Sequence, residues 1–72
     1  MTETAPGYAT IVVGGNSAGA VQKAHKNAQT GLMTQVIGFK WELNVVRELA
    51  RDMQLRIEPI SNNGLLLWKE AN

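Results

Sequence analysis

The chain has 72 residues, of which 44% are hydrophobic and 18% are charged, and its formal net charge is +1. This length suits one small domain, and this composition is typical of a folded chain rather than a disordered one. The sequence contains no cysteine and one histidine, which excludes disulfides, thiolate metal sites and cysteine nucleophiles. We therefore predict a domain that is not an enzyme and has no catalytic residues, no metal and no cofactor.

The placement of charge is more informative than the net charge. Between Glu3 and Glu42 there is no acidic residue but there are three lysines, so residues 1–41 carry a net charge of +2. The N-terminal half is thus expected to attract anions. No apolar run approaches the roughly 18 residues of a membrane span, and no charged-then-apolar leader opens the chain. These features predict a cytoplasmic protein without a membrane partner.

The first half of the chain predicts a strand, a helix and a second strand. We expect residues 1–7 to form a flexible N-terminal lead and residues 8–72 to form the domain. Residues 8–13 are rich in β-branched side chains and end at Gly14-Gly15, which indicates a strand. Asn16 or Ser17 can cap a helix over 17–29 that Gly31 terminates. Its apolar stripe consists of Ala20, Val21, Ala24 and Ala28.

The second half predicts a helix and a hairpin. Residues 32–39 favour a strand, and residues 42–53 favour a helix. The apolar face of this helix contains Leu43, Val45, Val46, Leu49, Ala50 and Met53. Residues 54–60 alternate like a half-buried strand, with Pro59 at an edge or at the strand's end. Asn62-Asn63-Gly64 is typical of a type I′ turn, which leads into a last strand over 65–69.

The element order is therefore β-α-β-α-β-β, which predicts an α/β (α+β) two-layer sandwich. Both helices would pack on one face of a mixed four-stranded sheet, and the last two strands would form an antiparallel hairpin. A helical hairpin over 17–53 is the alternative, but Thr34–Phe39 is a poor helix former. By topology the order resembles three families: the C-terminal domain of the third bacterial translation initiation factor, the Alba chromatin proteins and the sulfur carriers of tRNA thiolation. The first two resemblances imply RNA or DNA binding, whereas the third needs a cysteine that this chain lacks.

The first candidate site is the turn Gly14-Gly15-Asn16-Ser17. A strand, a glycine-rich turn and a helix N-terminus can present backbone N–H groups to a phosphate. Residues 10–21 resemble the opening segment of flavin-binding oxidoreductases, although that family has glycine where this chain has Asn16. Phosphate or nucleotide binding at this turn is one alternative function. The structural alternative is a tight turn that needs glycine for its backbone geometry.

The second candidate site is a basic surface of Lys23, Lys26 and Lys40 beside that turn. Lysines on a helix face can contact a phosphate backbone, so the main prediction is a non-enzymatic domain that binds an anionic partner, most plausibly RNA or DNA. Phe39 and Trp41 flank Lys40, where they would either stack on bases or anchor the core. The alternative to the basic surface is an ordinary solvated helix face.

The third candidate is the apolar strand Leu65-Leu66-Leu67-Trp68, which places large side chains on both sheet faces. We predict a partner or dimer surface at Leu65, Leu67 and Trp68, because an exposed apolar patch is usually covered. The corresponding alternative function is a protein-interaction regulator, inhibitor or homodimeric adaptor that acts by strand addition. A further set of side chains is predicted to form an ion-paired solvated face: Arg47, Arg51, Arg56, Glu48, Asp52 and Glu58.

Overall fold

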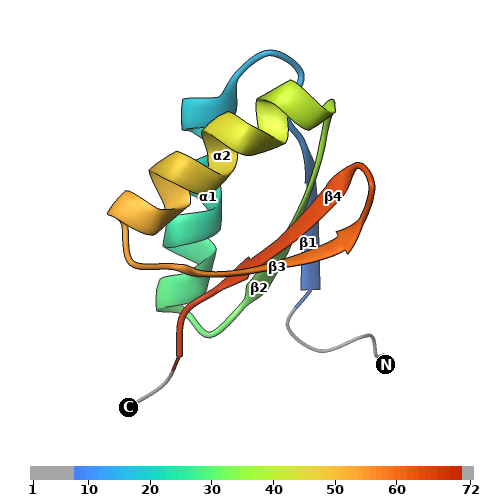
Figure 1. Ribbon diagram of the computed structural model, residues 1–72. Helices are drawn as coiled ribbons and strands as arrows, with labels where there is room; N and C mark the ends of the chain where they lie inside the picture. Colours follow the sequence, from blue (N-terminus) through green and yellow to red (C-terminus); the bar gives the residue numbers. More distant parts are fainter. Residues whose placement is uncertain (1–7, 71–72) are drawn as a thin grey trace.

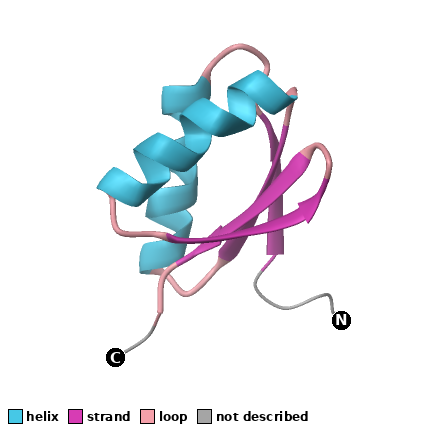
Figure 2. Cartoon of the chain, in the orientation of Figure 1, coloured by secondary structure: helices cyan, strands magenta, loops and turns pink. Residues whose placement is uncertain are grey.

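The computed structural model describes residues 8–70, and the predicted lead over 1–7 lies outside the described residues. Two helices cover one side of a sheet, as Figure 1 and Figure 2 show from the same direction. The elements are β1 (Tyr8–Val12), α1 (Ser17–Gln29), β2 (Met33–Ile37), α2 (Lys40–Asp52), β3 (Arg56–Ser61) and β4 (Gly64–Trp68). The predicted order β-α-β-α-β-β is confirmed.

The four strands form one mixed sheet in the order β1-β2-β4-β3. β1 and β2 run parallel, and β4 is antiparallel to both β2 and β3. The two edges of the sheet are therefore β1 and β3, while β4 lies inside it. This order decides which surfaces adjoin each other, because side chains beside β1 and side chains beside β3 are separated by the width of the sheet.

Helix α1 begins and ends where its local sequence predicts. The Asn16 side chain accepts a hydrogen bond from the Gly19 N–H at 3.0 Å, which satisfies one of the unpaired donors of the first turn. At the other end the Gly31 N–H donates to the Ala28 carbonyl and the Leu32 N–H to the Asn27 carbonyl. This is the Schellman arrangement. All four members of the predicted apolar stripe are buried.

Helix α2 begins two residues earlier than predicted, at Lys40 rather than Glu42. Phe39 is the extended N-cap residue, and the Glu42 side chain reaches back to accept from the Phe39 N–H. The buried face of the helix differs from the predicted one at two positions. Glu42 is buried, whereas Val45 is exposed.

The C-terminus of α2 has its own Schellman arrangement, with Gln54 at a φ of 61° where glycine is usual. The Leu55 N–H donates to the Ala50 carbonyl at 3.0 Å, and the Leu55 side chain is buried. The following strand thus starts at Arg56, two residues later than predicted. Gln54 and Leu55 therefore belong to the C-terminal cap of α2 and not to β3.

The β3–β4 hairpin forms as predicted, but its turn is not type I′. That turn requires positive φ at both central residues, and in residues 8–70 Gln54 is the one non-glycine residue with positive φ. The strand pairing instead shifts between Pro59 and Ser61, which leaves Ile60 as an extra residue. A bulge of this kind adds local twist to an edge strand.

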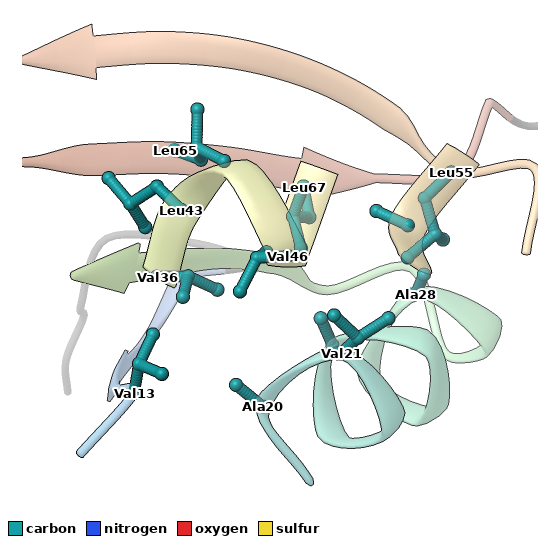
Figure 3. Packing of buried hydrophobic residues seen from close by; sticks show 12 residues of the cluster. Val13, Ala20, Val21, Ala28, Val36, Leu43, Val46, Leu55, Leu65 and Leu67 are labelled. Carbon is teal, nitrogen blue, oxygen red and sulfur yellow. The ribbon is translucent and has the colours of Figure 1, made fainter. Parts of the chain in front are cut away.

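The core lies between the helices and the inner sheet face (Figure 3). Its centre is formed by Val21, Val36, Val46, Leu65 and Leu67, which are almost completely buried. The one neutral polar side chain among the buried residues is that of Thr34, whose hydroxyl accepts from the Asn27 side-chain amide at 3.0 Å. That hydrogen bond offsets the cost of removing the hydroxyl from water.

No helix within residues 8–70 is long and apolar enough to cross a membrane.

Candidate functional site

Backbone N–H groups of the glycine-rich turn are already bonded to side chains of the protein. Gly14 and Gly15 adopt positive φ values of 56° and 81°, so glycine serves the backbone geometry of the turn. The Gly15 N–H donates to Glu42 Oε2 at 2.8 Å, and Asn16 holds the Gly19 N–H. Ser17 is the first residue of α1 and directly follows the turn whose Gly15 N–H donates to Glu42. The side chain of Glu42 thus stands where the phosphate was expected.

Glu42 is the candidate site residue that the sequence reasoning missed. Its side chain is 4% exposed, and its two oxygens accept from Gly15 N–H on the β1–α1 turn and from Phe39 N–H at 3.0 Å. A buried carboxylate is stable when N–H donors and a helix N-terminus surround it, as here. A negatively charged group beside Gly15 also repels an anionic ligand. The turn therefore favours a cation rather than a phosphate.

The three predicted lysines do not form one surface. Lys23 and Lys26 are exposed on α1, and Lys23 borders a groove along β1 with Ile11 and Asn16. Lys40 is exposed at the start of α2 and borders a different groove, beside Ser61 and Gly64 of the hairpin. Lys23 and Lys40 therefore border different hollows, one beside β1 and one beside the β3–β4 hairpin, at opposite edges of the sheet.

Lys40 belongs instead to a basic groove between α2 and the hairpin edge. Two adjoining hollows of about 280 and 560 Å³ share Arg47 and Pro59. The basic groove is lined by four cationic side chains, and no acidic side chain lines it. These cationic residues are Lys40, Arg47, Arg51 and Arg56.

The helical repeat aligns this basic groove. At 100° per residue, Lys40, Asn44, Arg47 and Arg51 fall within about 60° around α2. From Lys40 to Arg51 the rise along the helix is about 17 Å at 1.5 Å per residue. The cations thus form a line along the helix rather than a compact cluster, which suits an extended anion.

The predicted ion-paired face is not formed. Within residues 8–70 the one ion pair joins Arg56 to Glu70 at 3.6 Å, and both side chains are more than half exposed. Arg56 lies outside α2, so the expected helical pairing with Asp52 does not occur. Arg47 and Arg51 have no acidic partner within 4 Å in the described part of the chain. Lys40 is likewise in no ion pair of the described residues, so three of the four cations in the basic groove are available to an outside anion without breaking an internal pair.

The apolar strand places side chains on both sheet faces as predicted, but two of its three predicted partner residues are buried. Leu65 and Leu67 point into the core beneath the helices, so they are not available to a partner. Leu66 and Trp68 lie on the opposite face of the sheet and are half-buried. Since β4 is flanked by β2 and β3, it has no free edge for strand addition.

Two aromatic side chains flank Lys40 at the N-terminus of α2 and are not in the core. Phe39 is 67% exposed and Trp41 is 63% exposed. Aromatic side chains that are this exposed in an isolated small domain often belong to a surface that a partner covers. Both are adjacent in sequence to the first cation of the basic groove.

Neither a metal centre nor a relative was found. Residues 8–70 contain no group of three or more His, Cys, Asp and Glu side chains that could hold a metal ion. A scan against protein-family models found no match, and searches of curated proteins and of solved structures also found none. The function must therefore be argued from the residues themselves.

Proposed function

We propose that this chain is a small non-enzymatic domain that binds nucleic acid through the basic groove between α2 and the hairpin edge. The observation that carries this proposal is the line of Lys40, Arg47 and Arg51, with Arg56 beyond it and no acid in the lining. Phosphates recur at short, regular intervals along a nucleic-acid strand, so a line of cations can contact several of them.

The exposed aromatic that follows Lys40 in the sequence favours nucleic acid over a simple acidic polymer. Trp41 follows Lys40 directly and offers an unburied indole. A base has a flat π-face that can stack on such a ring, and base–aromatic stacking contributes about 1–3 kcal/mol per base. An acidic peptide has no equivalent group. Single-stranded segments, whose bases are free to stack, are therefore the preferred form.

The salt dependence of binding tests the proposal. Three to four cations neutralise about three phosphates, which gives a slope of log K against log salt of about −3 on duplex DNA. Affinity should then fall about 60-fold between about 50 and about 200 mM salt. Fluorescence anisotropy with labelled single-stranded DNA, single-stranded RNA and duplex DNA measures this. Absence of binding at the lowest salt, or binding that salt leaves unchanged, contradicts the proposal.

A pair of double variants locates the surface. Arg47→Glu with Arg51→Glu reverses two charges in the basic groove, and Lys23→Glu with Lys26→Glu makes the same change in charge on α1. We expect the first pair to weaken binding at least tenfold, which corresponds to about 1.4 kcal/mol, and the second to weaken it less than threefold. All four side chains lie outside the buried core, so both proteins should fold. Equal losses in the two double variants rule out the basic groove as the contact surface.

A second candidate function is weak self-association through the open sheet face, the face turned away from the helices. On β1, β2 and β4 this face carries the apolar side chains Val12, Ile37, Leu66 and Trp68. Within residues 9–70, none of the side chains that these three strands place on this face is charged. On β3 the same face carries Arg56 and Glu58, which pair in register with Trp68 and Leu66. The uncharged part of the face, on the other three strands, can meet its own copy without like-charge repulsion. Four strands about 4.8 Å apart and five residues long give the whole face an area of about 300 Å².

The small area of the open sheet face sets the expected strength of the dimer. Two copies would cover about 600 Å², which is below the roughly 1,200 Å² of a stable interface. We therefore expect a dimer that forms only at high concentration. Sedimentation equilibrium on the wild type, Val12→Asp and the helix-face control Gln22→Asp tests it. A monomer at every concentration, or equal dimerisation of all three proteins, contradicts this function.

A further inference from the structure

A hollow of about 350 Å³ opens at the carboxyl ends of β1 and β2, between the glycine turn and the start of α2. Its volume is in the range of small-molecule sites. Apolar walls come from Val12, Ile37 and Phe39, and Glu42 also lines it. Val12 is 69% exposed and Phe39 is 67% exposed, so two of the most accessible large apolar side chains of residues 8–70 border this hollow, which we call the Glu42 pocket.

The Glu42 pocket has a buried negative group without a counter-cation. Each carboxylate oxygen of Glu42 accepts one backbone N–H, from Gly15 and from Phe39, which leaves further lone pairs unused. No Lys, Arg or His side chain in residues 8–70 lies within 4 Å of it. A desolvated carboxylate is more stable when a cation pairs with it. The negative charge of Glu42 and the apolar walls of the pocket therefore suit a ligand that has both a positive charge and an apolar part.

Glycine opens the Glu42 pocket to its carboxylate. A Cβ on Gly38 would lie 2.8 Å from Glu42 Oε1, which is closer than real contacts allow, and 3.0 Å from Val13 Cγ2, which is an unusually tight contact. Gly38 also lines the pocket, as does Gly15, so backbone without side chains borders the carboxylate. A small group can thus approach Glu42 between the apolar walls.

We propose that the Glu42 pocket binds a small molecule with a primary ammonium group on a compact apolar body. The ammonium group donates to the unused lone pairs of Glu42, and the apolar body contacts Val12, Ile37 and Phe39. An ammonium ion over the exposed face of Phe39 gains a further cation–π attraction. This site does not depend on the nucleic-acid proposal, because Arg47, Arg51 and Arg56 do not line it.

The experiment is an NMR titration of the ¹⁵N-labelled protein with benzylamine, benzyl alcohol and benzoate. These three probes have the same ring and differ in the charge of the polar group. We expect benzylamine to shift the amide signals of Gly15, Gly38 and Phe39 saturably, with a Kd at least tenfold lower than that of benzyl alcohol, and benzoate to cause no saturable shift. Equal affinity for the amine and the alcohol, or shifts that do not saturate at these amides, overturns the proposal.

Two variants divide the site into its two parts. Glu42→Gln should abolish the preference for benzylamine over benzyl alcohol. Val12→Thr, at a highly exposed position that should not disturb the core, should weaken both probes by a similar factor because it makes one wall polar. If Glu42→Gln does not fold, the comparison of the three probes on the wild type and the Val12→Thr variant still test the proposal. A Val12→Thr protein that binds both probes as tightly as the wild type also overturns the proposal.

Discussion

Replacing Glu42 with alanine should lower the free energy of unfolding by about 3 kcal/mol. The side chain makes two hydrogen bonds, of 2.8 Å to the Gly15 N–H and 3.0 Å to the Phe39 N–H, and each such bond to a charged acceptor contributes about 1.5–3 kcal/mol. We use the lower value for both, because Gly15 is exposed and its N–H can bond to water in the variant. Glu42→Gln keeps one acceptor oxygen and should lose about half as much.

Urea unfolding followed by circular dichroism measures this difference, with Glu48→Ala as the matched control. Glu48 is an exposed acid on the same helix, so its removal should change stability by no more than about 0.5 kcal/mol. In a domain of this size a loss of 3 kcal/mol lowers Tm by about 12–24 °C. If Glu42→Ala and Glu48→Ala unfold within about 0.5 kcal/mol of each other, the carboxylate is not the structural link that its contacts indicate.

Two further substitutions test the core and the close approach at Gly38. Leu67→Ala should cost about 2–5 kcal/mol and Leu66→Ala clearly less, because Leu67 is fully buried and Leu66 half-buried; equal unfolding midpoints in urea would refute the assigned strand faces. Gly38→Ala should cost about 1–3 kcal/mol, because its Cβ would collide with Glu42 Oε1; a thermal melt that matches the wild type would show that this contact relaxes freely.

The sequence predicts the elements well where the signals are local. Helix α1 has its cap at Asn16, its apolar stripe and its terminator Gly31 within one short segment, and the structure matches all three. The fold class follows from the order of such segments. The start of α2 was missed because a capping box is normally recognised by Ser or Thr at the N-cap, and here the N-cap is Phe39. The glutamate three residues later was the remaining signal.

The role of Glu42 could not be derived from any local pattern. Its bond to Gly15 spans 27 residues, and the chain brings these two together only when α2 starts beside the end of β1. An acid near the start of a helix and a double glycine after a strand each have an ordinary local explanation. In the structure the Glu42 carboxylate lies where a phosphate was predicted, so the ligand expected at this turn is a cation and not an anion.

The predicted basic surface failed for a similar reason. Net charge by segment grouped Lys23, Lys26 and Lys40, but strand order, which the sequence pattern does not specify, puts β1 and β3 on opposite edges. The line of Lys40, Arg47 and Arg51 was hidden because the predicted helix began after Lys40. With the correct helix start, the 100° repeat alone would have aligned these three cations.

The apolar strand shows how a correct observation led to a wrong surface. Four consecutive apolar residues are typical of a strand inside a sheet, and β4 lies between β2 and β3. A strand inside a sheet cannot accept another chain by strand addition, since both of its edges are already paired. Of the two true edges, β3 contains Pro59, which has no N–H to donate, and a bulge at Ile60 that interrupts the pairing register. Strand addition is therefore disfavoured at β3 as well as at β4. An apolar partner can instead contact the open sheet face, where Val12 rather than Leu65 or Leu67 is the most accessible large side chain.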